Sequence, residues 1–285
     1  MTYKLDPQTM YMMPTHFGPS TGPRQGPDGR KFECKDNPKS TSVSVGFLTN
    51  SGQLEELLPP GGFELSGEPV VTVSATYMTE IEWLAGRGYN VLGVSFPVVF
   101  NGEEDRAKGS LLTVLWENLC DPILTGREQL GFSKIYCELP EPVVLRGEIH
   151  AIASWLGFKF LDMKLSNLHE MPLPQTAPAA APSHESDDDV LTGTLHYKYI
   201  PRTGEWGTPD VAYAVLTPSE GGNERTTELW RGEGTVEFHK ARWEDLPTQY
   251  SIVNAFHDLE IKEYRGASFS KGIGSKDLSD QRILR

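Results

Sequence analysis

One lysine stands out among the residues that could carry chemistry. Lys134 lies in the sequence GREQLGFSKIY (residues 126–136), between a Gly-Phe-Ser run and two bulky apolar residues. Side chains alternate between the two faces of an extended strand, so Phe132, Lys134, Tyr136 and Glu138 are expected on one face. Either that face is solvated, with Lys134 paired to Glu138, or it lines an apolar cavity into which Lys134 projects. The local pattern alone favours the solvated arrangement.

Patterns that mark other catalytic centres are missing from the sequence. No GxGxxG motif joins a strand to a helix, and the phosphate-binding and nucleophile-elbow motifs GxxxxGK[ST] and GxSxG are absent. The seven histidines are scattered and the three cysteines have no CxxC spacing, so we expect no metal and no cofactor. His16, in the N-terminal region, is the most suggestive histidine and a candidate substrate contact, although a loop histidine bonded to backbone is more common.

The segment that contains Lys134 belongs to a chain of many short strands. β-Branched, alternating and apolar runs predict strands at 41–49, 69–78, 91–100, 110–118, 133–139, 143–165, 192–201, 211–219 and 234–241. Short helices are expected after Asn50 and over 121–131, where Gly131 would end the second one, and a helical turn and a last strand over 252–269. Many strands with few helices predict a mainly β fold, a curled antiparallel sheet or barrel.

Composition divides the chain into three parts. Residues 1–40 are rich in proline and glycine and are expected to form an extended arm, followed by a β domain over 41–269. Within that domain, 172–189 is Pro/Ala-rich and then acidic, which predicts a flexible surface loop. Residues 270–285 are polar and are expected to form a peripheral tail.

The charge balance restricts the partners. The 285 residues contain 26 Lys and Arg against 39 Asp and Glu, a net charge of -13. Such a field repels phosphate groups, so neither nucleic acid nor an anionic membrane is expected as a partner. The N-terminus has no continuous apolar stretch typical of a signal peptide, and no apolar run is long enough to span a bilayer. We therefore expect a cytoplasmic protein.

Several motifs together point to a known family. Gly126, Arg127 and Glu128 precede an aromatic residue at 132 and the lysine at 134. Further segments occur in the same order: LEELLPPGGFEL with Glu68-Pro69 (54–69), FPVVFNG (96–102), GEIHAIASWLGFK (147–159), YKYIPRTG (197–204), and Trp230, Gly232, Val236 and Phe238 before Asp245-Leu246-Pro247. Over roughly residues 44–265 this ordered set resembles the acetoacetate decarboxylase family.

The resemblance implies that Lys134 is a Schiff-base nucleophile. It would attack a substrate ketone and form an iminium, which accepts electrons as a β-carboxylate leaves as CO2. Attack needs a neutral amine, so the pKa of the lysine must lie well below its usual value of about 10.4. Apolar surroundings lower it, and the candidates for this wall are Phe132, Phe96, Phe100 and Tyr136. The implied fold is a closed, cone-like barrel that assembles into homo-oligomers.

Two positions depart from the pattern of the family. A second lysine usually follows the nucleophile, but Ile135 occupies that position, so desolvation would have to activate Lys134 alone. A catalytic glutamate is expected about ten residues before the end of the Phe-Asn-Gly strand, where this chain has Val91. Val91 is therefore expected at the substrate, and another group or water must move the proton.

The basic residues near the site are ambiguous in sequence. The family has an early arginine that binds the substrate carboxylate, but Arg24, Arg30 and Lys31 all lie in the arm and none aligns with it clearly. Arg127 and Glu128 match the family loop and either contact substrate or form a structural ion pair.

Three functions fit these residues. The first is a lysine Schiff-base lyase acting on a keto acid or related carbonyl compound, with β-keto acid decarboxylation as the default reaction. The second is aldol, dehydration or cyclisation chemistry on a larger keto substrate in secondary metabolism, which the missing lysine and glutamate favour. The third is a non-catalytic binding protein on the same barrel.

Overall fold

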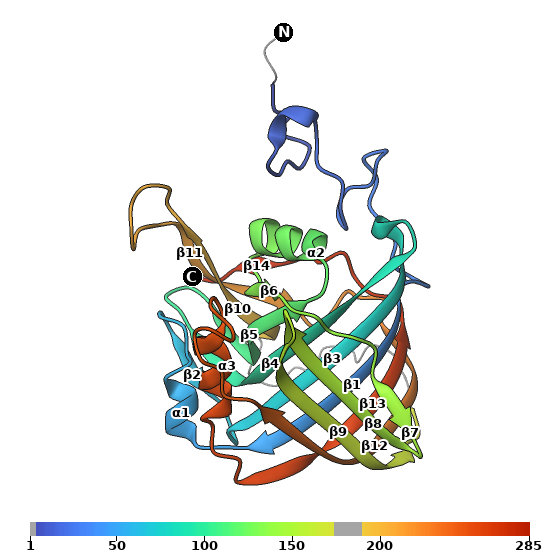
Figure 1. Ribbon diagram of the computed structural model, residues 1–285. Coiled ribbons are helices and arrows are strands. Elements are labelled where there is room, and N and C mark those ends of the chain that lie inside the picture. Colours follow the sequence, from blue (N-terminus) through green and yellow to red (C-terminus); the bar gives the residue numbers. More distant parts are fainter. Residues whose placement is uncertain (1–3, 174–189) are drawn as a thin grey trace.

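The structure is a computed structural model that describes residues 4–173 and 190–285, and one large sheet dominates it (Figure 1). The predicted acidic loop 172–189 lies outside the described residues except for its first two positions. The strands are β1 (Lys39–Leu48), β2 (Phe63–Leu65), β3 (Val70–Ile81), β4 (Arg87–Asn101), β5 (Arg106–Glu117), β6 (Lys134–Tyr136), β7 (Val143–Leu145), β8 (Glu148–Trp155), β9 (Phe158–Glu170), β10 (Val190–Pro201), β11 (Pro209–Pro218), β12 (Arg225–Phe238), β13 (Glu263–Ile273) and β14 (Arg282–Ile283).

The sheet curls, as the mainly β prediction requires, but its ladder does not close. Among the described residues its order is β14-β11-β10-β5-β4-β3-β1-β13-β12-β9-β8-β7, with β2 on β4 and β6 on β5. It is also not purely antiparallel, because β10 and β6 both pair with β5 in parallel. Of the two predicted arrangements, the curled sheet is confirmed; the closed barrel that the family resemblance implied is not, and two of the pairings are parallel.

The segment that contains Lys134 crosses the gap in this curled sheet. On one side β6 pairs with β5, and just after β6 Glu138 forms an isolated antiparallel bridge with Ser154 of β8. Two backbone hydrogen bonds of 2.7 and 3.0 Å make this bridge. A short strand at a seam is held by neighbours on both sides, which fixes the direction of its side chains.

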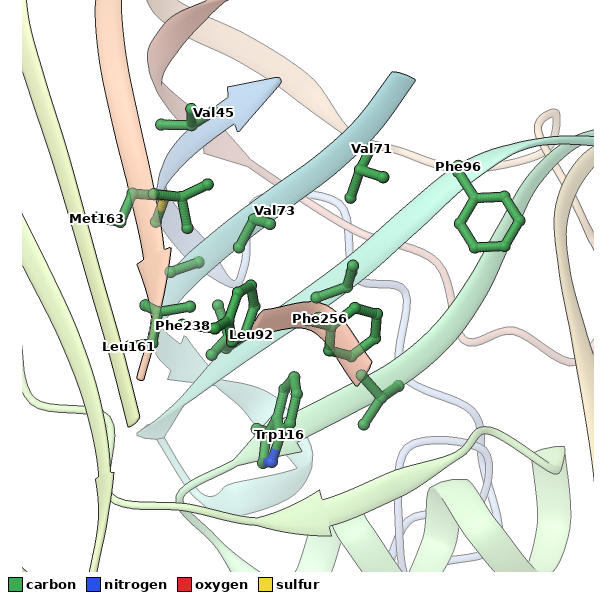
Figure 2. Packing of buried hydrophobic residues seen from close by; sticks show 14 of the residues in the cluster. Val45, Val71, Val73, Leu92, Phe96, Trp116, Leu161, Met163, Phe238 and Phe256 are labelled. Atoms are coloured by element: carbon green, nitrogen blue, oxygen red, sulfur yellow. The ribbon is translucent and has the colours of Figure 1, made fainter. Parts of the chain in front are cut away.

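The apolar core fills the inside of the curled sheet (Figure 2). Trp116 of β5 lies among three rings, with centroid distances of 5.3 Å to Phe160, 6.4 Å to Phe238 and 6.1 Å to Phe256. Its indole Nε1 donates a 2.7 Å hydrogen bond to Gln249, so the polar atom of a fully buried side chain is satisfied. Because side chains alternate, the residues on either side of Trp116 point away from this core.

Short helices cover the ends of the sheet: α1 (Ser51–Glu55), α2 (Cys120–Thr125) and α3 (Tyr250–His257). α2 continues into a π-helical turn (Gly126–Leu130) that ends at Gly131, as predicted, where φ is 82°. A positive φ is accessible to glycine at little cost, so the chain can reverse there into β6. In the described parts of the chain, no helix is long and apolar enough to cross a membrane.

The N-terminal arm and the C-terminal tail meet beside α2. Ser275 N donates to Cys34 O at 2.8 Å, and Gly274 N donates to Pro38 O at 3.0 Å. Further along the tail, β14 joins the sheet by pairing with β11. Residues from both ends of the chain are thereby brought beside Tyr89 of β4 and Pro122 of α2.

Candidate active site

Lys134 is the first residue of β6, and its side chain is buried with 7% of the residue exposed. Its Nζ lies 2.8 Å from Oε1 of Glu117 and donates to Pro122 O at 3.2 Å. Glu138, the partner expected for a solvated lysine, instead accepts a hydrogen bond from Ser154. The solvated arrangement that the local pattern favoured is therefore wrong.

Close packing of α2 holds the lysine in place. A Cβ added at Gly126 would lie 2.4 Å from both Cδ and Cε of Lys134 and 2.8 Å from its Nζ. Real Cβ contacts are not that short, so only glycine lets the helix end pass so near the lysine. The Gly-Arg-Glu motif thus has a physical role, because its glycine makes room for the amine.

Burial lowers the pKa of Lys134 below its usual value. The Glu117 carboxylate opposes this shift, whereas the positive charge of Arg24 adds to it. The pKa of Glu117 is raised by burial and lowered by Lys134. Desolvation is thus the main cause, as expected, but it does not act alone, because an arginine provides a cationic neighbour.

A cavity of about 260 Å³, the Lys134 cavity, surrounds this amine. Its wall combines Arg24 of the arm, Tyr89 of β4, Pro122 of α2, Lys134 and Asp277 of the tail with further apolar and polar residues, among them the charged side chains of Glu82, Glu224 and Lys276. Segments from both ends of the chain therefore help to enclose the lysine, and the tail is more than peripheral.

Arg24 is a buried cation of this cavity, with 6% of the residue exposed. Its Nε donates to Oε1 of Gln129 at 2.9 Å and its Nη1 to Asp277 O at 3.3 Å. Both acceptors are neutral carbonyl oxygens, and no carboxylate lies within ion-pair distance of Arg24 among the described residues. Burial lowers the pKa of Arg24, but a guanidinium keeps its charge in proteins. The cavity thus contains a buried positive charge that forms no ion pair among the described residues, although the charge of Asp277 acts on it from a greater distance.

Tyr89 of β4 and Glu117 of β5 complete the polar surroundings of Lys134. Val91 of β4 lies directly opposite Glu117 of β5, so the carboxylate that sequence reasoning sought at 91 is provided from the neighbouring strand. Tyr89 shares the face of Val91 and lines the cavity. Burial and the charge of Glu117 raise the pKa of Tyr89, so its phenol stays protonated at neutral pH.

Phe132 is also near the lysine amine, although it does not line the Lys134 cavity. Its ring centroid lies 5.7 Å from Lys134 Nζ, and the ring stacks on His196 at 4.1 Å. Burial lowers the pKa of His196 to about 4, so the imidazole is neutral. Phe132 and Ile135 line a separate groove of about 520 Å³ beside α3, the α3 groove.

Two of the predicted site residues, Phe96 and Phe100, lie in the apolar core instead. Phe100 packs on Phe63 at 5.2 Å. Figure 2 shows Phe96 and Leu92 within this core. Burial alternates along β4, so Phe96 and Phe100 face the core, whereas Tyr89 and Val91 face the other way. These two phenylalanines therefore do not line the Lys134 cavity.

Two further residues that the sequence placed at the site, His16 and Tyr136, are exposed on the surface. His16 is exposed in a 3₁₀ turn (Thr15–Phe17) and contacts Phe17 at 5.0 Å, so it is not among the residues that line the Lys134 cavity. Tyr136 is 43% exposed and is not among the residues that line the Lys134 cavity.

Arg127 and Glu128 support the backbone around the lysine. Arg127 Nη1 donates to the carbonyl of Lys134 at 2.9 Å, and the carbonyl of Glu128 accepts from Lys198 Nζ at 2.7 Å. Within the described residues the two side chains do not form an ion pair with each other. Their positions make them structural supports of the turn before β6.

Sequence reasoning missed Glu117 and Tyr89 as members of the site, and it could not choose Arg24 from the three basic residues of the arm. Glu117 follows an apolar strand directly, and this placement at a strand end was the available signal. Arg24 had no local signal, because its position depends on how the arm packs against α2.

Comparisons with known proteins agree with the family resemblance seen in the sequence. A family model described as acetoacetate decarboxylase (ADC) matches residues 12–276. A comparison with curated proteins gave no match. Among solved structures, an acetoacetate decarboxylase has 17% identity and a TM-score of 0.61, covering 87% of this chain and 88% of that one. The acetoacetate decarboxylase of Legionella pneumophila has 19% identity and a TM-score of 0.60, with 91% and 92% covered.

A third similar structure is the enduracididine biosynthesis enzyme MppR in complex with pyruvate. It has 18% identity and a TM-score of 0.58, with 91% of this chain and 95% of that one covered. At these identities the structural matches establish the shared fold, and the family match extends over most of the sequence. The chain belongs to the acetoacetate decarboxylase family, whose members are lyases.

Proposed function

We propose that the protein forms a Schiff base between Lys134 and a keto acid, and that decarboxylation of a β-keto acid is its default reaction. Schiff-base chemistry on keto acids is the chemistry of the family. The observation that carries the proposal is a buried lysine of lowered pKa in the same small cavity as a buried arginine that forms no ion pair among the described residues.

The lysine is suited to attack a carbonyl carbon. Its lowered pKa increases the fraction of neutral amine near pH 7, and only the neutral amine is a nucleophile. The carbonyl of Pro122, 3.2 Å away, accepts a hydrogen bond from the amine and leaves the nitrogen lone pair free to point elsewhere. Close packing against Gly126 limits the movement of the side chain.

Arg24 is suited to hold the carboxylate of the substrate. A guanidinium has five N–H donors, and those used here go to neutral oxygens of Gln129 and Asp277, which leaves both its charge and some of its donors for an anion. Arg24 would therefore orient a keto acid with its carbonyl toward Lys134. Once the iminium forms, the C–C bond to the carboxylate breaks, CO2 leaves, and the electron pair passes through the enamine to nitrogen.

Carbon–carbon bond formation is the second candidate. The similar MppR structures include one with the condensation product of pyruvate and imidazole 4-carboxaldehyde. In the present chain Ile135, the residue after the nucleophile, faces the α3 groove rather than the Lys134 cavity, so no second lysine joins the amine there. The same imine, formed with pyruvate, would give an enamine that attacks an aldehyde, in the aldol-type chemistry of secondary metabolism.

Product analysis separates these reactions. The protein is incubated with acetoacetate and, separately, with pyruvate plus an aldehyde, while CO2 release and adduct formation are followed. CO2 release from acetoacetate that is lost in Lys134→Ala supports the default reaction. Adducts without CO2 release establish the second candidate, and the absence of any imine with either substrate leaves the non-catalytic binding protein. We also propose that the protein is cytoplasmic and assembles into homo-oligomers.

A further inference from the structure

We infer that Glu117 is a second catalytic residue of this site, and that it holds and returns the proton that imine formation at Lys134 requires. The inference rests on the proposed Schiff-base function. Glu117 ends β5 with 1% of the residue exposed, and its Oε1 lies 2.8 Å from Lys134 Nζ. The carboxylate thus touches the reacting nitrogen directly.

The second oxygen of this carboxylate has no partner. Oε2 of Glu117 is buried and accepts no hydrogen bond from the described residues. A buried, ionised carboxylate with one unpaired oxygen is costly, and a shared proton between carboxyl and amine reduces that cost. A purely structural ion pair would gain from donors to both oxygens, which are missing here.

The neighbouring groups leave the shared proton to Glu117 and Lys134. The charge of Glu117 acts on Tyr89 and on Cys137, and together with burial it raises the pKa of both, so they stay protonated. Arg24 is a permanent cation near Lys134, and His196 is neutral above a pKa of about 4. Only the carboxyl and the amine of this group exchange a proton near neutral pH.

The step balances with one proton in the pair. The neutral amine of Lys134 attacks the carbonyl carbon, the C=O electron pair moves to oxygen, and one amine proton follows it to give a carbinolamine. Glu117 then donates its carboxyl proton to the hydroxyl, which leaves as water as the nitrogen lone pair forms the C=N bond. The amine, ketone and carboxylic acid become an iminium, a carboxylate and water, with no change in total charge. The iminium is formed beside its counter-ion, which a buried site requires.

Because of the sheet register, a pair of substitutions can transfer this carboxylate from β5 to the facing position on β4. Glu117 and Val91 are directly opposed on antiparallel strands, where the Cβ atoms of such pairs are about 4.5–5.5 Å apart. A glutamate at 91 therefore begins on the same face and close to the same point. The double variant V91E/E117Q keeps one carboxylate at the site, and V91Q/E117Q is its matched control with none.

The experiment measures trapping of the iminium by cyanoborohydride, with acetoacetate and with pyruvate, across the pH range that the folded protein tolerates. Adducts at Lys134 are quantified by mass spectrometry. We expect E117Q to trap about 100-fold more slowly than the wild type at every pH, because a positioned acid or base contributes at least about that factor. V91E/E117Q should trap at least about tenfold faster than V91Q/E117Q.

A role limited to tuning the lysine gives a different result. Glu117 raises the pKa of Lys134, so its removal alone would shift the trapping profile to lower pH and leave the plateau rate unchanged. A shifted profile with the wild-type plateau, or equal rates for the two double variants, would overturn the inference. Absence of any adduct in the wild type would instead refute the Schiff-base function itself, so the two failures are distinguishable.

Discussion

Replacing Lys134 by methionine should make the stability of the protein depend on pH in a way that one carboxyl group controls. Methionine has similar length and no charge, so Lys134→Met leaves Glu117 buried without its cation. Breaking a buried ion pair by removing one partner costs about 3–5 kcal/mol when the remaining charge stays ionised. The carboxyl group avoids part of that cost by taking up a proton.

The direction of the pH effect follows from the pKa of Glu117. Burial raises it, and in Lys134→Met the lysine no longer lowers it. In the unfolded chain a glutamate titrates near about 4.3. Above that pH the unfolded state releases the proton while the folded state keeps it, so the unfolding free energy falls by about 1.4 kcal/mol per pH unit until the folded carboxyl ionises.

Urea unfolding of Lys134→Met and of Lys134→Met/Glu117→Gln at about pH 5 and about pH 8 isolates this group, because the second variant lacks it. We expect the single variant to lose stability relative to the double variant as pH rises. Parallel stability profiles for the two variants would refute the burial and pairing on which the site depends.

Three further predictions concern the same site. Gly126→Ala places a methyl group 2.4 Å from Cδ of Lys134 and should slow iminium trapping more than about tenfold and lower the unfolding free energy by about 1–3 kcal/mol, whereas Gly22→Ala, with 3.6 Å to its nearest neighbour, should change neither. Arg24→Gln should raise KM for a keto acid, and, because Arg24 lowers the pKa of Lys134, its loss should move the trapping profile to higher pH; an unchanged KM and profile would exclude Arg24 from the site. Ile135→Lys should leave the trapping profile unchanged, because this side chain lies in the α3 groove; a shift to lower pH would show that position 135 faces the amine.

Local patterns in the sequence predict the elements well because alternation and turn residues act locally. The strands around Trp116 and Leu92, and the reversal at Gly131 that leads into β6, follow directly from such signals. The open seam could not be predicted, because it depends on which distant strands pair. The bridge between Glu138 and Ser154 joins segments whose proximity no local pattern encodes.

The candidate site was predictable only in part, and for physical reasons. The ordered motifs identified Lys134, but Glu117 emerges from cross-strand register and Arg24 from the packing of the arm. Strand periodicity alone would have corrected one error. Phe96 has the opposite parity to Val91, so the two side chains cannot face the same cavity from one regular strand.

The most direct test of the account is to map the iminium itself. Wild-type protein is incubated with acetoacetate, reduced with cyanoborohydride, digested and analysed by mass spectrometry, with Lys134→Arg as the control that keeps a positive charge. We expect one stable adduct on the peptide that contains Lys134, and none in the variant. An adduct on another lysine such as Lys198, or an equal yield in Lys134→Arg, would contradict it.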